Sequence, residues 1–384
     1  MVRLGDICEK KIDTIKAAYK GDIDYVDISS IDNQRKVITQ IQSMSIEDAP
    51  SRAKQLVFPG DILVSTVRPN LNAVALITKN TDNVLVASTG YCVLRCLPNA
   101  DNKYVFYFCQ SPTFIEKLVV QATGASYPAV TSAIVRECAL PFPPLEEQRK
   151  IAAVLDKVSD LIAKRRQQLD KLDEAVKARF VEVFGEPDEN PKHWQEDELS
   201  HHLKVIGGYA FKSDGFTDEG IPVLRIGNIN SGHFLPVNMV YWPDDLALAR
   251  YKVFPGDLVM SLTGTVGKDD YGNVCILGAD YDEYYLNQRN AKLSIEKSLN
   301  KCYFSELLKF PRIKKRLTGI SRGIRQANIS NKDILTLRVP MPPIELQEQF
   351  AAFVEQTEKT KTTISQSLEK LETLKKALMQ EYFG

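Results

Sequence analysis

The chain contains two similar passages of 46 residues. Residues 140–185 read LPFPPLEEQRKIAAVLDKVSDLIAKRRQQLDKLDEAVKARFVEVFG, and residues 339–384 read VPMPPIELQEQFAAFVEQTEKTKTTISQSLEKLETLKKALMQEYFG. No gap interrupts the match, and corresponding residues such as Gly185 and Gly384 lie 199 positions apart. A fixed period of this length predicts a fold built from two copies of one unit.

Weaker matches extend the repeat upstream of each passage. VFPGDILVSTVRPN at residues 57–70 corresponds to VFPGDLVMSLTGTVG at residues 253–267, and YVDISSID from Tyr25 corresponds to VLRIGNIN from Val223. Variable and constant blocks therefore alternate along the chain. The predicted segments are a first variable domain at 1–144, a first constant helix at 145–185, a second variable domain at 186–339 and a second constant helix at 340–384.

Both constant blocks are predicted to be long helices. Two prolines and then acidic residues open each block, as is typical of a helix start. About 38 residues rising 1.5 Å each give a rod roughly 57 Å long. Apolar residues at steps of four and three form a heptad seam in each copy, at Ile151, Leu155, Val158, Ile162, Leu169, Leu172, Val176 and Val183, and at Phe350, Val354, Ile364, Leu368, Leu371, Leu378 and Tyr382.

The seam of each rod needs a partner. Thr357, Lys361 and Lys375 interrupt the second seam, whereas Arg165 and Arg179 complete the spacing of the first. Either each rod lies on the surface of its own domain, or the two rods pack on each other as an antiparallel coiled coil. We favour the second arrangement, which would give the chain a pseudo-two-fold axis.

The variable blocks are predicted to be mixed α/β (α+β) domains. Short β-branched runs bounded by turn residues predict strands near residues 61–67, 73–78, 83–89 and 91–97. Two helical stretches, at residues 104–122 and 303–319, are each interrupted before a proline. Both PGD triplets, ending at Asp61 and Asp257, are interpreted as turns that open a strand.

Composition sets further limits on the location and partners of the chain. Lys and Arg total 49 and Asp and Glu also total 49, so any nucleic-acid binding must come from local patches. Seven scattered cysteines with no C-x-x-C pair argue against a disulfide framework or a zinc knuckle. The N-terminus lacks an apolar signal segment and no run is long enough to cross a membrane, so a cytoplasmic location is expected.

A search for catalytic motifs finds little. Residues 264–268 (GTVGK) resemble a phosphate loop, but Leu262 and Asp269 stand where its first glycine and its hydroxyl residue are required. The two Pro-Pro pairs lack the flanking residues of an adenine methyltransferase motif. His201 and His202 have no obvious third metal ligand, so a solvated pair is favoured over a metal site. We therefore predict no catalytic residue and no metal site in this chain.

A basic segment in the second variable block is a candidate nucleic-acid contact. Residues 309–338 hold nine basic residues and one acid. Arg can bridge two acceptors of guanine, and Gln or Asn can bridge adenine. The alternative is a solvated basic helix end. The candidate contacts of this segment are Lys314, Lys315, Arg316, Arg322, Arg325, Gln326 and Asn328.

Other loops add candidates with different chemistry. The segment of the first block that matches this basic loop, TGASYPAVTS at residues 123–132, is nearly uncharged and offers hydroxyls and a tyrosine. The loops after the two PGD strands carry further polar residues. These candidates are Ser65, Thr66, Arg68, Asn70, Ser126 and Tyr127 in the first block, and Thr263, Thr265 and Lys268 in the second.

The doubled passage with its PPLEEQ start, together with the VFPGDILVSTVRPN loops, closely resembles the specificity subunit of type I restriction-modification enzymes over essentially the whole chain. The resemblance implies two target recognition domains that each read half of a bipartite site in double-stranded DNA. It implies two spacer helices that also dock two modification (adenine methyltransferase) subunits, with restriction and translocase subunits joining them. It assigns no catalytic residue to this chain.

The same resemblance places the cofactors elsewhere. S-adenosylmethionine, ATP and Mg²⁺ are expected in the partner subunits, and this chain is expected to hold none. The starts of the two helices are the expected docking residues: Pro144, Leu145, Glu146, Gln148, Pro343, Ile344, Glu345 and Gln347. The alternative function is a coiled-coil scaffold or adaptor that does not bind DNA, which would leave the diverged loops without a purpose.

Overall fold

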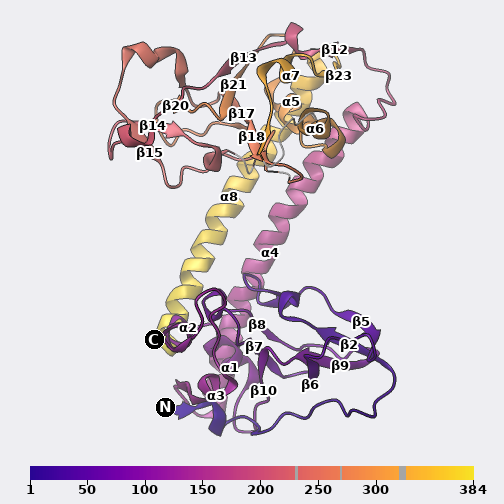
Figure 1. The fold of residues 1–384 in the computed structure, drawn as a ribbon, viewed down its shortest axis with the longest axis vertical. Coiled ribbons are helices and arrows are strands. Elements are labelled where there is room, and N and C mark those ends of the chain that lie inside the picture. Colours follow the sequence, from indigo (N-terminus) through magenta and orange to yellow (C-terminus); the bar gives the residue numbers. More distant parts are fainter. Residues whose placement is uncertain (230–231, 269, 320–325) are drawn as a thin grey trace. The chain divides into compact units, whose positions relative to one another are not determined.

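The computed structural model describes residues 1–229, 232–268, 270–319 and 326–384. The chain divides into two compact units, residues 1–168 with 363–384 and residues 169–362. Each unit holds one mixed α/β domain and parts of two long helices, α4 (Leu145–Phe184) and α8 (Ile344–Phe383) (Figure 1). The predicted fold class of two mixed domains and two long helices is therefore confirmed at this level.

The first unit contains two main sheets. Four strands lie in the order β5-β2-β9-β6 and three in the order β10-β7-β8, and only the β2–β9 pair is parallel. The strands are β1 (Val2–Arg3), β2 (Asp22–Val26), β3 (Ile31–Asp32), β4 (Val37–Ile38), β5 (Gln42–Ser45), β6 (Ala53–Leu56), β7 (Ile62–Ser65), β8 (Val74–Leu76), β9 (Val84–Ser88), β10 (Tyr91–Leu94) and β11 (Ala139–Leu140).

The second unit repeats this topology. Its sheets run β15-β14-β20-β16 and β13-β21-β17-β19, and among the described strands of these sheets β14–β20 is the parallel pair. The weak sequence matches upstream of the helices thus correspond to matching strands. The strands are β12 (Glu196–Glu198), β13 (Leu203–Gly207), β14 (Ile221–Leu224), β15 (Val240–Trp242), β16 (Lys252–Val253), β17 (Leu258–Ser261), β18 (Thr263–Thr265), β19 (Val274–Ile276), β20 (Tyr284–Leu286), β21 (Asn290–Ile295), β22 (Gln326–Asn328) and β23 (Arg338–Pro340).

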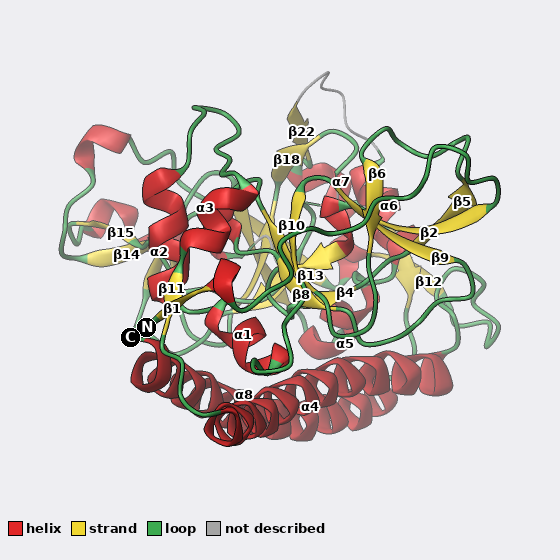
Figure 2. Ribbon diagram, turned by 90° about the horizontal axis from the view of Figure 1, so that it is seen from below, coloured by secondary structure: helices red, strands yellow, loops and turns green. Residues whose placement is uncertain are grey.

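The short helices also occur in matching pairs (Figure 2). Each predicted helical stretch is two helices, because a proline cannot continue a helix but suits the first turn of the next one. A side-chain oxygen of Ser111 caps one of these new starts by accepting from the Phe114 amide. The helices are α1 (Asn102–Phe108), α2 (Pro112–Gln121) and α3 (Ser132–Glu137), and α5 (Lys301–Leu307), α6 (Pro311–Thr318) and α7 (Asn331–Leu335).

The two PGD triplets form the predicted turns. The Asp61 carboxylate accepts from the Phe58 amide (2.9 Å) and from the Arg95 guanidinium (2.7 and 2.8 Å). In the second unit, Asp257 accepts from the Phe254 amide (2.8 Å) and forms a 2.6 Å ion pair with Lys292. Each carboxylate therefore fixes the entry into a central strand, β7 or β17, and its role is structural.

A buried glutamine anchors the start of each long helix. The Gln148 side chain accepts from the Asp101 amide (2.9 Å) and donates to the Pro143 carbonyl (2.9 Å). Gln347 repeats both bonds, with the Asn300 amide (2.8 Å) and the Pro342 carbonyl (2.7 Å). Both side chains are fully buried.

This anchoring corrects one sequence prediction. Gln148 and Gln347 were expected to contact a partner subunit, but a fully buried side chain offers no surface to one. Each glutamine instead ties the helix start to the amide that precedes a short helix, α1 or α5, of its own unit. The glutamine is therefore present in both copies of the repeat because each helix start needs this anchor.

The buried face of each long helix leaves the heptad seam near the helix end. Phe180 and Phe184, one position beyond the predicted Arg179 and Val183, are buried in the core of the second unit. Met379 and Phe383, one position beyond Leu378 and Tyr382, are buried in the core of the first. An α-helix has 3.6 residues per turn and drifts against a seven-residue repeat, so the core-facing stripe moves by one residue over several heptads.

The two lysines that interrupt the second seam have partners. Lys361 pairs with Asp173 (2.8 Å) and Glu358 (2.7 Å) in the second unit. In the first unit the Lys375 ammonium lies 5.4 Å from the centre of the Tyr107 ring, and burial lowers the pKa of Lys375. Both lysines therefore make favourable contacts at seam positions where apolar residues were expected. Packing of the two helices along their whole length as an antiparallel coiled coil stays a prediction.

The drift of the buried stripe gives a stability prediction. Phe180→Ala should lower the free energy of unfolding by about 3–5 kcal/mol, because the ring packs on Tyr303, Phe310 and Phe350. Val183, at the predicted seam position, is half-buried. Val183→Ala should therefore lower the free energy of unfolding clearly less. Urea unfolding followed by circular dichroism compares the two variants, and an equal or larger loss for Val183→Ala would contradict the drift.

The glutamine anchors give a second prediction. Gln148→Leu and Gln347→Leu keep the volume of the side chain but leave a buried amide and a buried carbonyl without partners. Each should lower the free energy of unfolding by about 1–3 kcal/mol. Glu146→Gln and Glu345→Gln change exposed neighbours and are the matched controls. No loss of stability is expected for them. Urea titrations compare these variants. If the Gln→Leu variants are as stable as the Glu→Gln controls, the anchoring role is refuted.

Candidate nucleic-acid interface

Two loops of the first unit lie side by side at the end of β7. Val67 and Ala129 form an isolated antiparallel bridge, and the Arg68 amide donates to the Pro128 carbonyl (2.7 Å). Gly124 adopts a φ of +103°, and a β-carbon there would lie 2.9 Å from the Tyr127 carbonyl oxygen. Residues 65–72 and 122–131, distant in sequence, therefore form one composite loop.

An arginine and a tyrosine stack on the surface of this composite loop. The Arg68 guanidinium lies 4.5 Å from the centre of the Tyr127 ring, and Tyr127 is 68% exposed. Asn70 and Ser126 are also exposed. Arg68 adopts a left-handed conformation with a φ of +49°, which the bonds to the neighbouring loop hold in place. The structure thus brings the predicted Arg68 and Tyr127 into direct contact.

Two other predicted contacts in this loop are wrong. Ser65 and Thr66 are buried, and their hydroxyls donate to the Val67 carbonyl (3.0 Å) and the Gly90 carbonyl (2.8 Å). They continue the central strand before the chain turns outward. Their hydroxyls hold the turn in shape and do not reach the surface.

The second unit pairs the corresponding loops as a short hairpin-like ladder. β18 lies antiparallel to β22, with Thr263 opposite Asn328 and Thr265 opposite Gln326. Asn328 matches Ala129 in the repeat, so both units join the same two loops at the same place. Thr265, Lys268 and Asn328 are exposed, and Thr263 is half-buried.

Asp270 holds the tip of the first of these loops. Its carboxylate accepts from the Thr265 amide (2.8 Å) and the Thr265 hydroxyl (2.9 Å). The bond from the Thr265 amide is the main reason that the pKa of Asp270 is lowered. Because its hydroxyl is already donating, Thr265 can offer DNA only an acceptor.

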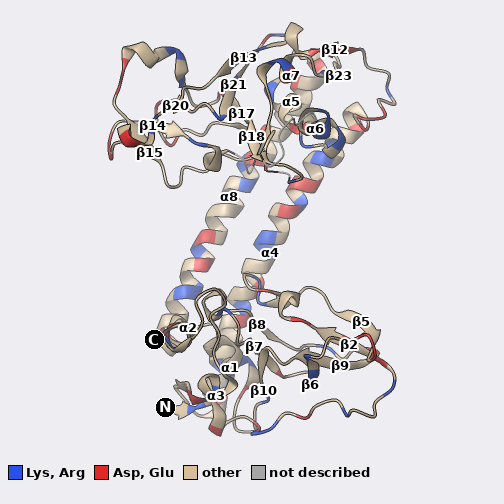
Figure 3. Ribbon diagram, viewed as in Figure 1, with Lys and Arg blue, Asp and Glu red and all other residues tan. Residues whose placement is uncertain are grey.

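The basic residues of the second unit gather on α6 (Figure 3). Lys315 and Arg316 are exposed, and Arg316 also donates to the Arg338 carbonyl (3.3 Å). Lys314 is buried and donates to the Asn273 side chain (2.6 Å), so the prediction that Lys314 contacts DNA is wrong. The helical spacing explains the split, because adjacent residues on a helix point in different directions.

Part of the basic candidate segment lies outside the described residues. Arg322 and Arg325 fall in the gap between residues 319 and 326, and Gln326 is placed only as a backbone position of β22. Their proposed roles therefore rest on the sequence alone.

The sequence reasoning missed Arg289. This exposed residue lies in the turn between β20 and β21, and its carbonyl accepts from the Leu262 amide (2.8 Å) beside β18. In the first unit Gly90 occupies the matching place, since its carbonyl accepts from the Thr66 amide (2.9 Å). The polar NQRN run at residues 287–290, between two strands, was the available signal.

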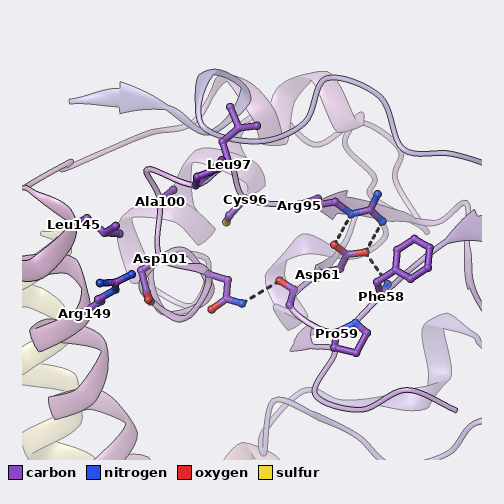
Figure 4. A pocket seen from close by; sticks show the side chains of 13 residues that line it. Phe58, Pro59, Asp61, Arg95, Cys96, Leu97, Ala100, Asp101, Leu145 and Arg149 are labelled. Carbon is purple, nitrogen blue, oxygen red and sulfur yellow. Dashed lines mark hydrogen bonds and ion pairs between the residues drawn. The ribbon is translucent and has the colours of Figure 1, made fainter.

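The starts of the long helices are partly exposed. Pro144, Glu146, Pro343 and Glu345 are exposed, and Leu145 and Ile344 are half-buried. Beside the start of α4 the first unit has a hollow of about 510 Å³. Figure 4 shows its wall, which includes Phe58, the Asp61–Arg95 pair, Cys96 and Leu145.

The histidine pair of the second unit shares one carboxylate. His201 and His202 lie 2.9 and 3.1 Å from the two oxygens of Asp197, and His202 also contacts the Ser298 hydroxyl (2.7 Å). The hydrogen bond from His201 is the main reason that the pKa of Asp197 falls to about 2. Within the described ranges no group of three or more His, Cys, Asp or Glu residues could hold a metal ion.

Comparison with known proteins identifies relatives over the whole chain. The family model described as type I restriction modification DNA specificity domain matches residues 1–173 and 191–373. The MjaVIII type I restriction enzyme specificity subunit of Methanocaldococcus jannaschii is 26% identical over 299 residues, which are 73% of this chain and 68% of that protein. A putative MjaX specificity subunit of the same organism is 24% identical and covers 99% of this chain and 85% of its own.

Solved structures show the same fold. The S subunit of a type I restriction-modification system from M. genitalium matches with a TM-score of 0.58 at 15% identity, over 100% of this chain and 95% of that one. A chain from a structure on complex assembly and conformational transition of the type I R-M system matches with a TM-score of 0.57 at 24% identity, over 99% and 96%. Among the described helices, none is long and apolar enough to span a membrane.

These relatives decide between the functions left open by the sequence. They are named specificity subunits, so the expectation that this chain recognises DNA and is not itself the enzyme is confirmed, and the scaffold alternative is not favoured. The family model covers both variable domains and most of both long helices. The chain therefore belongs to the family of type I restriction-modification DNA specificity proteins.

Proposed function

We propose that the two variable domains, residues 1–144 and 186–339, each read one half of a bipartite site in double-stranded DNA. One observation carries the proposal: both units join the same two loops at the same place, Val67 to Ala129 and Thr263 to Asn328, yet the loops carry different side chains. A shared scaffold with different exposed groups is what two readers of different sequences require.

In the first domain, Arg68, Asn70, Ser126 and Tyr127 are the proposed contacts. Arg68 can donate two hydrogen bonds to guanine, and Asn70 can pair with adenine. The stacking on Tyr127 restricts the guanidinium, so less conformational entropy is lost when it binds a base. This domain is proposed to read mainly through a few oriented side chains.

In the second domain the proposed contacts are more basic. Lys315 and Arg316 on α6 suit phosphate oxygens, and Asn328 and Thr263 lie on the ladder where base edges can be reached. Arg289 joins them because its turn is bonded to the same strand end. Thr265, Lys268, Arg322, Arg325 and Gln326 complete the proposed set.

The long helices, residues 145–185 and 340–384, are proposed to pack as an antiparallel coiled coil that sets the distance between the half-sites. Two contacts support this arrangement. Arg166 of α4 pairs with Glu372 of α8 (2.6 Å) in the first unit, and Asp173 of α4 pairs with Lys361 of α8 (2.8 Å) in the second. A rod of roughly 57 Å could hold two readers about one helical turn of DNA, near 34 Å, apart.

The proposed protein partners are two modification subunits, with restriction and translocase subunits joining the complex. The exposed or half-buried helix starts, Pro144, Leu145 and Glu146 and the matching Pro343, Ile344 and Glu345, are the proposed docking residues. Because these starts are repeated, the same partner could bind twice. S-adenosylmethionine, ATP and Mg²⁺ would be held by the partners, and the complex would act in the cytoplasm.

One substitution tests the assignment of a half-site to a domain. Arg68→Ala should relax base preference at one position of one half-site by about 1–3 kcal/mol and leave the other half-site unchanged. The measurement is gel retardation of the chain with its modification subunits, on duplexes varied one base pair at a time. Arg3→Ala removes an exposed arginine of the same unit that pairs with Glu137 and serves as the control.

Two outcomes would contradict this assignment. Equal weakening on all duplexes, with a smaller salt dependence, would mean that Arg68 contacts a phosphate. Altered preference in both half-sites would mean that the first domain does not read one half by itself.

A further inference from the structure

Two cysteines of the first unit face each other across neighbouring chain segments. Cys8 and Cys96 form an isolated antiparallel bridge. The flanking bonds run from the Glu9 amide to the Arg95 carbonyl (2.8 Å) and from the Leu97 amide to the Ile7 carbonyl (2.9 Å). The two cysteines are therefore a non-hydrogen-bonded pair, the arrangement in which facing residues approach most closely.

This geometry suits a disulfide. The α-carbons of a non-hydrogen-bonded pair are about 4.5 Å apart. Disulfides join residues whose α-carbons are about 4.4–6.8 Å apart. Facing residues on adjacent antiparallel segments also direct their side chains to the same side. The two sulfurs can therefore meet without a rearrangement of the backbone.

The surroundings favour reaction at this pair over the other cysteines of the unit. Cys96 is half-buried and lines the hollow beside the start of α4 (Figure 4), whereas Cys8 is buried. The Cys96 thiol donates to the Cys8 sulfur, which lowers the pKa of Cys8, and Arg136 adds to the effect. Burial raises the pKa of Cys92, Cys109 and Cys138. The bond to Cys8, and then burial, also raise the pKa of Cys96, so Cys8 is the more acidic thiol of the pair.

We propose that Cys8 and Cys96 are an oxidation site that a peroxide converts to a disulfide. The thiolate forms on Cys8, whose sulfur accepts the hydrogen bond from the Cys96 thiol, and its proton goes to solvent. The Cys8 thiolate attacks the peroxide and the O–O bond breaks, which gives a Cys8 sulfenic acid. The hydroxide that leaves takes the proton of Cys96 and becomes water. The Cys96 thiolate then attacks the Cys8 sulfur and the S–O bond breaks. The hydroxide that leaves takes up a proton from solvent, which replaces the one that Cys8 lost, so two thiols and one hydrogen peroxide give one disulfide and two waters.

The second unit shows that the fold does not need this pair. At the matching register, Leu203 of β13 lies opposite Ile295 of β21. An apolar pair therefore packs at the same place in the other copy of the domain. The thiols are an addition to the first unit, where a disulfide would join the N-terminal segment to the wall of the hollow.

Intact mass spectrometry of the full chain tests the proposal. Hydrogen peroxide should remove about 2 Da, the mass of two hydrogen atoms. Digestion without reductant should yield one linked peptide pair, containing Cys8 and Cys96, and dithiothreitol should restore the original mass. Cys8→Ser and Cys96→Ser should each abolish the loss.

The second unit supplies the matched control. A variant with both Cys8→Leu and Cys96→Ile carries the apolar pair of that unit, so it should fold and stay without a linkage under the same treatment. Linkage of other cysteines in the unchanged protein would overturn the proposal. Oxygen addition at Cys8 or Cys96 without a bond between the two, or no reaction with peroxide at all, would overturn it equally. DNA binding is not the readout, so the result does not depend on the proposed function.

Discussion

Burial of the ends of the two long helices is the interaction on which the rest of the structure depends. Phe180 and Phe184 of α4 complete the core of the second unit, and Met379 and Phe383 of α8 complete the core of the first. Each helix begins in one unit and ends in the other, so neither domain has a full core without the far end of a helix that starts elsewhere. The internal repeat makes this exchange reciprocal.

The two copies of the repeat share the residues that the fold needs and differ in the loop side chains that are proposed for recognition. The buried Gln148 and Gln347 and the Asp61 and Asp257 turns make the same bonds in both units, because both domains must start their helices and central strands in the same way. The paired loops keep their backbone bridge but differ in their side chains. If these loops contact DNA as proposed, recognition could change in one domain without disturbing the scaffold of the other.

Sequence periodicity predicted much of this fold and less of its surface. The gapless repeat predicted the two units, and proline positions predicted the breaks between the short helices. The seven-residue pattern placed Arg179 and Tyr382 on the seam, but the buried stripe drifts to Phe180 and Phe383, because an α-helix turns once in 3.6 residues. Residue type alone likewise suggested Lys314, Ser65 and Thr66 as DNA contacts, whereas their burial follows from strand and helix geometry.

On the proposed function, one chain holds two independent DNA readers. Sequencing that detects methylated adenine, applied to host DNA in the presence of the assembled complex, tests it most directly. Two readers in one chain predict methylation at a motif of two defined half-sites separated by base pairs of any sequence. A single contiguous motif, with no unread gap, would contradict it.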